Sequence, residues 1–345
     1  MTSDQNTIPQ AVMRLRELAL SSACAAAVRA AARLGLPDAL GDQPSTVEDL
    51  ASALGADADA LGRLMRMLEC YYVFEKTDTG YVHTPMSRLL REDNPRSLKY
   101  IVLWGTEPWT WELWPHLDES VRSGDEAFQK LHGTDFFAHL HDEWPDSAAV
   151  FDKAMTQSSK LSAAAIADRL DLTGVRSLAD IAGGQGHVLA TLLEKNPGLQ
   201  GVLVDLPAVV ADADPRLRAG GPLASRAQLV AGDCLAEIPV DAEVYLFKNI
   251  LEWDDASTIT ALGNAARAAR AGSRVLIIEN LVDGSPELKF TTAMDLLLLL
   301  NVGGRKHTRD GLVALIEEAG LHVDDVRPIN SYLHLIEASV PQESP

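Results

Sequence analysis

Three glycines between an apolar run and a helical pattern are the residues of this chain best suited to hold a ligand. Gly183, Gly184 and Gly186 follow the apolar run at residues 178–181 and precede a helix-like stretch. A glycine has no Cβ, so the backbone can turn sharply there and pass close to a bound molecule. Asp205 ends the next apolar run about 20 residues on, where a carboxylate can bind a ribose diol. These residues predict a cradle for a nucleoside-containing cofactor.

A third apolar run, at residues 229–231, is followed by Gly232 and Asp233, so an acid is available at the adenine edge of the same nucleoside. The same spacing is typical of nicotinamide dinucleotide sites. The glycines and acids therefore predict a nucleoside cofactor and leave its class open.

Strands and helices alternate downstream of residue 170. The expected strands cover residues 177–181, 201–205, 228–232, 242–247 and 274–279, with a terminal pair around 323–328 and 331–338. Short apolar runs separated by helical patterns are typical of a parallel sheet with helices on both faces. Such sheets bind ligands at the carboxyl edge, where the strand order reverses. We expect Asp180, Asp205, Asp233 and Trp253 to converge there.

The first hundred residues form a separate helical unit. Residues 12–20 and 25–36 have apolar positions at helical spacing on an alanine-rich background, which suits a partner subunit. Residues 45–55 and 58–70 add two helices, and the whole is typical of a winged-helix unit. Acids outnumber basic residues in these two helices, and the chain carries a net charge of -19. Nucleic acid and anionic membranes are therefore not expected as partners.

Length and composition favour a two-domain cytoplasmic protein. A chain of 345 residues exceeds the usual size of one hydrophobic core. No apolar run reaches membrane-spanning length, and the polar N-terminus at residues 1–6 lacks the pattern of a signal peptide. Cys24, Cys70 and Cys234 show no metal-ligand spacing, so we expect free thiols in a reducing compartment and no metal site.

Four tryptophans fall within residues 104–114. A tryptophan stripe at helical spacing usually packs into a core. Gly105 and Pro108 interrupt this segment, so the four rings cannot all share one helical face. Trp104 and Trp109 can equally line a pocket for a flat aromatic substrate, and both interpretations stay open.

Six motifs follow one another along the chain: D-I-A-G-G-Q-G at 180–186, V-D-L-P at 204–207, G-D-C at 232–234, W-D-D at 253–255, M-D-L at 294–296 and G-G-R-K-H-T-R-D at 303–310. Through them the chain, from about residue 12 to residue 338, resembles the small-molecule O-methyltransferases that use S-adenosylmethionine. This family contains plant phenylpropanoid and bacterial polyketide enzymes.

The resemblance implies an α/β fold in which an α-helical, winged-helix-like dimerisation domain precedes a Rossmann-like methyltransferase domain with a seven-stranded, mostly parallel sheet. The implied boundaries are residues 1–100 for the dimerisation domain, 101–165 for bridging helices that line the substrate pocket, and 166–345 for the catalytic domain. It also implies a homodimer that binds S-adenosylmethionine and a small aromatic substrate.

The resemblance assigns roles to residues in or beside the motifs. Cofactor binding falls to Asp180, Gly183, Gly184, Gly186, Asp205, Leu206, Asp233, Cys234, Lys248 and Trp253. Substrate contact falls to Trp104, Trp109, Phe151, Met155, Ser159, Met294, Leu298 and Asn301. Phe151, Met155 and Ser159 share one helical face, whose alternative interpretation is interdomain core. Trp253 is expected to stack on the adenine, the alternative being a core position.

The glycine loop departs from the family at one position. Ala182 stands where the family has the first glycine, which is compatible with close cofactor approach if this residue keeps a negative φ.

A larger departure concerns proton transfer. Family members commonly carry L-H-D-W, with histidine as the general base, and G-G-x-E-R-T, with an acid that orients it. Here the segments read Leu251-Glu252-Trp253 and G-G-R-K-H-T. Without a gap, Leu251 replaces the base and Lys306 replaces the acid. With one deletion before Trp253, Glu252 falls near the base position, and Asn249 can lie close to it.

His187 and His307 are the histidines nearest to the motifs, but we expect His187 to cap the cofactor helix and His307 to face the cleft between the domains. The candidate catalytic residues are therefore Glu252, Asn249 and His307.

Anthracycline-type polyketide methyltransferases also lack both the histidine base and the acid that orients it. In those enzymes catalysis is ascribed mainly to holding the hydroxyl in line with the methyl group. The resemblance thus implies O-methylation of an aromatic polyketide or quinone-like natural product by proximity and orientation. The alternative is a protein that binds the cofactor but catalyses hydroxylation or rearrangement without methyl transfer.

Overall fold

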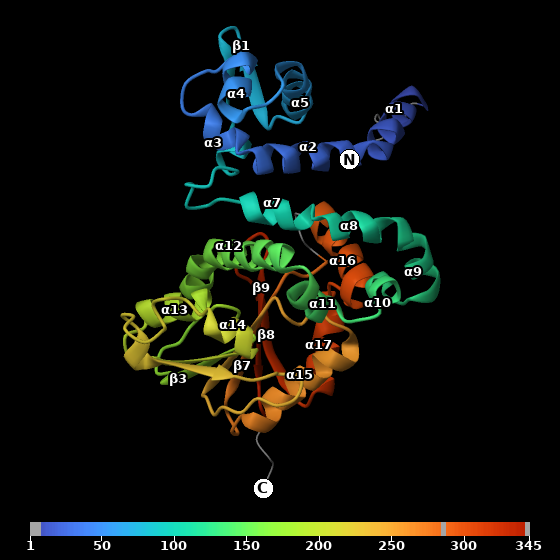
Figure 1. Ribbon diagram of the computed structural model, residues 1–345. Helices are drawn as coiled ribbons and strands as arrows, with labels where there is room; N and C mark the ends of the chain where they lie inside the picture. The colour runs from blue at the N-terminus through green and yellow to red at the C-terminus, as the bar shows by residue number, and fades with distance from the viewer. Residues whose placement is uncertain (1–7, 284–287, 342–345) are drawn as a thin grey trace. The chain divides into compact units, whose positions relative to one another are not determined.

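The computed structural model describes residues 8–283 and 288–341, so the polar segment at residues 1–6 lies outside the described residues. The chain divides into two compact units, and Figure 1 labels many of their helices and strands. The first unit comprises residues up to 111 together with 146–157, and the second comprises 112–145 and the chain from 158 onward. The segment expected to bridge two domains, residues 101–165, thus contributes to both units. The expected domain limits stay a prediction.

Helices form most of the first unit. Its elements are α1 (Ile8–Ala19), α2 (Ser21–Leu34), α3 (Leu36–Leu40), α4 (Val47–Leu54), α5 (Ala58–Cys70), β1 (Phe74–Thr77), β2 (Gly80–His83), α6 (Pro85–Arg88) and α7 (Lys99–Gly105). Thr46 begins α4 by accepting a hydrogen bond from the Asp49 N–H, and Asp57 begins α5 in the same way with Ala60. β1 and β2 pair antiparallel and form the expected two-stranded wing.

One helix of the first unit leaves its apolar residues exposed. No residue of α1 is buried, and Ile8, Met13 and Leu15 are exposed by 81%, 56% and 69%. By contrast, α2 and α5 bury apolar residues in the core of this unit. No helix of the described residues is long and apolar enough to cross a membrane.

The second unit contains one large sheet and the helices around it. Its strands are β3 (Ser177–Ile181), β4 (Gln200–Asp205), β5 (Ala227–Ala231), β6 (Val244–Lys248), β7 (Arg274–Glu279), β8 (His322–Pro328) and β9 (His334–Ser339). Its helices are η2 (Trp114–His116), α9 (Leu117–Ser123), α10 (Ala127–His132), α11 (Phe136–Glu143), α13 (His187–Lys195), α14 (Pro207–Ala211), η3 (Ala224–Arg226), α15 (Asp255–Ala268), α16 (Leu288–Val302) and α17 (Arg309–Glu318). Two helices cross the limits between the units: α8 (Pro108–Leu113) and α12 (Pro145–Arg169).

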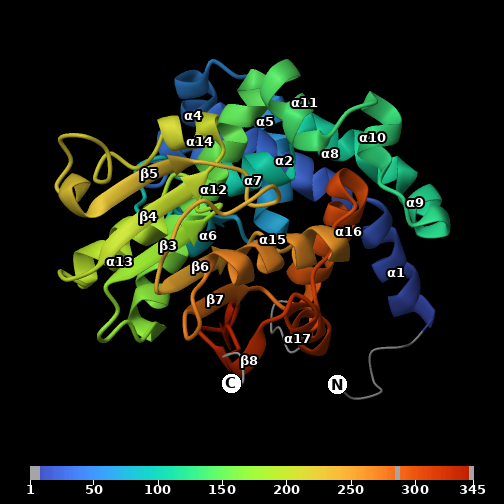
Figure 2. The ribbon, with the colours of Figure 1, turned by 90° about the horizontal axis from the view of Figure 1, so that it is seen from below.

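The sheet has the order β5-β4-β3-β6-β7-β9-β8. β3 to β7 pair parallel, whereas β9 pairs antiparallel with both β7 and β8. Figure 2 shows β4, β3, β6 and β7 lying side by side. The strand order reverses between β3 and β6, so the carboxyl ends of these two strands form the edge where a ligand is expected. The expected fold class is confirmed.

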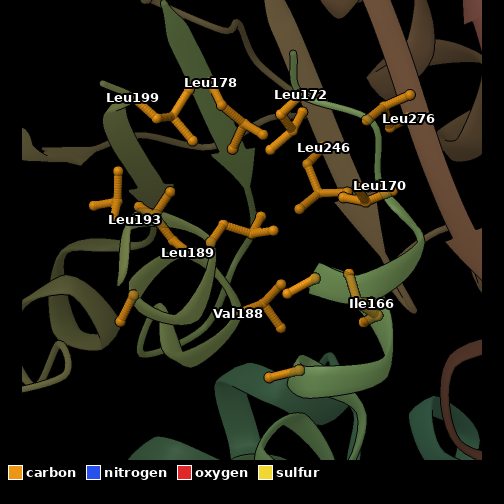
Figure 3. Close-up of a cluster of buried hydrophobic side chains, with 14 of the residues drawn as sticks. Ile166, Leu170, Leu172, Leu178, Val188, Leu189, Leu193, Leu199, Leu246 and Leu276 are labelled. Atoms are coloured by element: carbon orange, nitrogen blue, oxygen red, sulfur yellow. The ribbon is translucent and has the colours of Figure 1, made fainter. Parts of the chain in front are cut away.

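Apolar clusters cover both faces of this sheet. One joins Ile166 of α12 with Leu189 and Leu193 of α13 and with Leu178 and Leu246 of the sheet (Figure 3). The other packs α15 and α17 against the opposite face. The strands are buried on both faces because helices cover both, which explains their continuous apolar runs.

Candidate active site

The turn after β3 has room only for glycine at two positions. A Cβ placed on Gly183 would lie 2.5 Å from Cγ of Asp180 and 2.7 Å from Cδ1 of Leu203. Gly186 has φ +78°, and its Cβ would lie 2.6 Å from Cδ1 of Leu217. Gly184 has φ +62° and open space where a side chain would be. The loop is therefore tightly packed against the sheet and open at Gly184, as a cofactor cradle requires.

Ala182 does not keep the negative φ under which alanine is compatible with close cofactor approach. Its φ is +48°, in the left-handed region. Its N–H donates to the Val204 carbonyl of β4 at 2.8 Å, which holds the residue in place. The alanine methyl group thus costs the loop about 1–2 kcal/mol of backbone strain that a glycine would not carry.

Two carboxylates lie at the carboxyl edge beside this loop. Asp205 accepts hydrogen bonds from the N–H groups of Gly184 at 2.8 Å and Leu206 at 2.7 Å. Burial raises the pKa of Asp205 to about 6. Asp180 is 1% exposed, and its Oδ2 has no hydrogen-bond partner among the described residues. Burial, together with Asp205, raises the pKa of Asp180 to about 7.

Oδ2 of Asp180 is a buried acceptor without a partner among the described residues, and it lies near the Asp205 carboxylate, which two backbone N–H groups hold in place. A ligand that brings hydroxyl donors or positive charge fits this arrangement, because burying a polar acceptor without a partner is costly. These residues therefore fit a nucleoside cofactor with cationic groups.

The remaining expected cofactor residues lie near the same edge. Oδ1 of Asp233 accepts from the Leu235 N–H at 2.8 Å, which fixes the turn after β5. Cys234 is buried, and burial raises the pKa of its thiol to about 12, so the thiol is protonated. Leu206 is exposed, and Trp253 is half-buried against the apolar cluster that contains α15. Their cofactor contacts stay a prediction.

His187 is the first residue of α13, but it does not cap the helix. Gly186 occupies the cap position, and no side chain caps this end. Instead, Nδ1 of His187 lies 2.6 Å from Oδ2 of Asp214, whose N–H donates to the Gln185 carbonyl at 2.7 Å. Burial lowers the pKa of His187. The expected capping role is wrong. The His187–Asp214 contact fixes the glycine loop from outside, and no motif marks Asp214 in the sequence.

Glu252 and Lys306 form an ion pair, although 54 positions separate them. The Lys306 side chain is 3% exposed and the Glu252 side chain 17% exposed. The backbone reinforces the pair, because the Arg305 N–H donates to the Glu252 carbonyl at 3.1 Å. A Cβ on Gly304 would lie 1.9 Å from that carbonyl oxygen, so only glycine fits there. The two segments that depart from the family are therefore in direct contact.

Glu279, at the end of β7, is a site residue that the sequence patterns left out. It is 2% exposed, and its Oε1 accepts from the N–H groups of Ile250 and Leu251, both at 3.0 Å. Burial raises its pKa to about 8, with a contribution from Glu252. The available signal was an acid at the end of an apolar strand, the same signal that marked Asp180 and Asp205.

Lys248 ends β6 at the same edge. Burial lowers the pKa of its ammonium group, while Glu279 and Asp180 act in the opposite direction. Asn249, the next residue, has φ +52°, and its Oδ1 is buried without a hydrogen-bond partner among the described residues. Asparagine adopts this left-handed conformation readily, and Glu279 holds the loop that follows through the N–H groups of Ile250 and Leu251.

His307 is buried, and its Nε2 lies 2.7 Å from the Leu251 carbonyl. A carbonyl only accepts, so this nitrogen carries the proton. Burial lowers the pKa of His307. Nε2 is therefore unable to accept a proton from a substrate while this bond holds. Catalytic roles for Glu252, Asn249 and His307 stay predictions.

The expected substrate residues fall into both units. In the first unit, the rings of Trp104 and Phe151 meet edge to face with centroids 6.2 Å apart. Trp109 is 3% exposed, as the core interpretation requires, and Met155 is 36% exposed.

In the second unit, Met294, Leu298 and Asn301 follow one another at i, i+4 and i+7 and so share a face of α16. Asn301 is buried, and its Oδ1 has no partner among the described residues. Ser159, on α12, is half-buried. Neighbouring backbone ties α16 to the ion pair, because the Lys306 N–H donates to Oδ1 of Asp295 at 2.7 Å. Contact of these residues with substrate stays a prediction.

Two family models match the chain. An O-methyltransferase domain matches residues 114–322, and an O-methyltransferase dimerisation domain matches residues 16–93. The mitomycin biosynthesis 6-O-methyltransferase of Streptomyces lavendulae is 35% identical over 307 residues, which cover 88% of this chain and 87% of that protein. The phenazine-1-carboxylate N-methyltransferase of Pseudomonas aeruginosa is 32% identical and covers 87% of this chain and 88% of its own length.

Among solved structures, an O-methyltransferase from neocarzinostatin biosynthesis, in complex with S-adenosylmethionine and 2-hydroxy-5-methyl naphthoic acid, is similar to the chain with a TM-score of 0.77 and 30% identity. The similarity covers 92% of this chain and 95% of that one.

Proposed function

Because the chain belongs to the family of S-adenosylmethionine-dependent small-molecule O-methyltransferases, we propose that it methylates a hydroxyl group on an aromatic natural product of the polyketide or quinone type. Two relatives support the acceptor class: one acts in mitomycin biosynthesis, and the other is solved with a hydroxynaphthoic acid. The edge-to-face rings of Trp104 and Phe151 offer apolar surface of the kind that holds a flat ring.

We assign different parts of the cofactor to different residues at the carboxyl edge. S-adenosylmethionine supplies an electrophilic methyl group on a sulfonium centre. Asp205, oriented by the N–H groups of Gly184 and Leu206, is placed to accept from a ribose diol. Asp180 offers a buried acceptor without a protein partner. Gly184 leaves room for the ligand beside the loop.

The observation that carries the proposed mechanism is that both candidate proton acceptors, Glu252 and His307, are already bound to other groups of the protein. Lys306 binds the carboxylate of Glu252, and Leu251 holds the protonated Nε2 of His307. Neither group is a free base of the kind that removes a proton from a weakly acidic hydroxyl. Proximity and orientation can supply about 7–11 kcal/mol of the barrier reduction. We therefore propose that the site positions an acceptor whose hydroxyl is already acidic.

Mass spectrometry after incubation with S-adenosylmethionine and a panel of hydroxylated anthraquinones tests this function. We expect the product to gain one methyl group in place of a hydrogen, with release of S-adenosylhomocysteine. An aminoanthraquinone of matched shape serves as the control, because an N-methyltransferase is among the relatives. Methylation of the amine alone would contradict O-methylation, and an oxidised or rearranged product without a methyl group would favour the alternative chemistry.

We also propose that the protein is a homodimer. The dimerisation-domain match covers most of the first unit, and the apolar residues of α1 are exposed within the described chain. A second copy of the same surface would cover them.

A further inference from the structure

The ion pair between Glu252 and Lys306 is asymmetric. Oε1 of Glu252 contacts the Lys306 ammonium, which is almost fully buried, while the carboxylate itself remains partly exposed. The ammonium end of the pair thus lies inside the protein, whereas the carboxylate end is partly accessible to solvent.

Several titratable groups surround this pair. They come from separate elements: Lys248 from β6, Glu279 from β7, Asp255 from α15, Asp295 from α16, Arg305 and His307 on either side of Lys306, and Tyr332 before β9. Burial acts to lower the pKa of Lys306, but Glu252 and Glu279 raise it above its ordinary value, so the ammonium keeps its charge. Burial raises the pKa of Glu279 to about 8 and also raises the pKa of Tyr332, so both are uncharged at neutral pH. The charges of the pair itself are those of Glu252 and Lys306, while burial lowers the pKa of Lys248.

A carboxylate at the edge of a methyl-acceptor site opposes the binding of an anion. A like charge nearby raises the pKa of an acidic group by about one unit or more, and an opposite charge lowers it. An uncompensated Glu252 would therefore keep a phenol protonated and unreactive. The Lys306 ammonium compensates this charge from a position that is almost fully buried.

We propose that Lys306 is a positioning residue that compensates the charge of Glu252, so that the acceptor binds as a phenolate. The inference rests on the proposed function and names the ionisation state of its substrate. The phenol loses its proton to solvent before transfer. In the transfer step the phenolate oxygen forms a bond to the methyl carbon, the carbon–sulfur bond breaks, and its electron pair stays on the sulfur. The negative charge of the oxygen and the positive charge of the sulfonium disappear together, and no proton leaves.

The test measures the ionisation of a bound acceptor directly. 2-Hydroxyanthraquinone, whose phenolate absorbs at longer wavelength than its phenol, is titrated from pH 5 to 10 on the protein with S-adenosylhomocysteine present, so no turnover occurs. We expect Lys306→Met to raise the pKa of the bound phenol by about one unit or more. Glu252→Gln should lower it, and the double variant should return to the wild-type value. Lys76→Met, which removes an exposed lysine of β1, is the control and should change nothing.

The pH profile of kcat/KM should shift with the same signs. A fold defect does not produce opposite shifts in two single variants that cancel in the double variant. If Lys306→Met fails to fold, the other two variants still give the direction in which the pKa of the bound phenol shifts. These are Glu252→Gln and the double variant, in which both side chains are uncharged. An unchanged midpoint in both folded variants would overturn the proposal. So would a fall in rate of about 10²- to 10⁴-fold in Glu252→Gln, which is the loss expected of a true general base.

These failures differ from failure of the proposed function. Absence of both binding and methylation of every hydroxylated anthraquinone by the wild-type protein would contradict the acceptor class. If the wild type binds and methylates the acceptor but the pKa of the bound phenol is the same in the Lys306 and Glu252 variants, only the role of Lys306 is contradicted.

Discussion

Ala182 is held in the left-handed region because its N–H is bound to β4 and Gly183, the next residue, has no room for a side chain. This strain can be removed by one substitution. Ala182→Gly relieves about 1–2 kcal/mol of strain and adds about 0.5–1 kcal/mol of chain entropy to the unfolded state.

We therefore expect Ala182→Gly to raise the melting temperature of the cofactor-free protein by about 2–4 °C per kcal/mol of net gain. Ala314→Gly, on the exposed side of α17, is the matched control and should lower stability by about 1 kcal/mol. Equal losses in both variants, measured by calorimetry, would show that position 182 is not strained.

Asp180 ties the stability of the cofactor-free protein to pH. Its pKa is raised from 3.8 to about 7, so between these values the folded protein holds a proton that the unfolded chain has lost. Stability should therefore fall as pH rises through this window. Asp180→Asn should flatten this dependence, leaving the part that comes from Asp205 and Glu279. Thermal denaturation at pH 5, 6, 7 and 8 measures the slopes, and identical slopes for the two proteins would contradict a raised pKa at Asp180.

At the scale of elements, a buried ion pair joins three helices of the first unit. Arg29 of α2 binds Glu107 at 2.8 Å and also donates to the Leu103 carbonyl at the end of α7. Ser147, in the first turn of α12, donates to the other carboxylate oxygen of Glu107 at 2.6 Å. The Arg29 and Glu107 side chains are 14% and 7% exposed. Removing one partner therefore leaves a buried charge alone.

Glu107→Ala should lower the free energy of unfolding by about 3–5 kcal/mol, the range for breaking a buried pair. Arg122→Ala, which breaks the exposed pair with Asp118, should change it by about 1 kcal/mol or less. Urea denaturation followed by circular dichroism compares the two. A loss at Glu107 no larger than that at Arg122 would show that the pair does not hold these helices together.

The elements around the cofactor were predictable from sequence, because their signals are local. Glycines that must turn sharply, and acids that end apolar runs, depend on residues within one turn of the chain, so Gly183, Gly186 and Asp205 lie where expected. The contacts that determine the chemistry are not local. Asp214 reaches His187 and Lys306 reaches Glu252 across long stretches of chain, and neither pairing has a spacing that sequence patterns can detect.

At the scale of the whole molecule, α1 is the helix that we expect to contribute to the dimer interface. It buries no residue within the described chain, so removing residues 1–19 should cost an isolated subunit little stability. A dimer would lose an apolar face. We expect this truncation to retain its helical content and to sediment as a monomer at micromolar concentration, where the full chain sediments as a dimer. A truncated protein that remains dimeric at the same concentration would place the interface on other elements.

The ion pair at the carboxyl edge also limits the routes by which this active site can change through single mutations. Histidine at position 252 alone would leave the Lys306 ammonium buried beside an imidazole, and an acid at position 306 alone would place two carboxylates in contact. Each single step leaves a charge uncompensated, which is more costly than either paired state. Gly304 cannot relieve the crowding, because a side chain there would meet the Glu252 backbone. A change of the charge at either position is therefore tolerated best when the other position changes with it, and a designer who alters this edge must change both together.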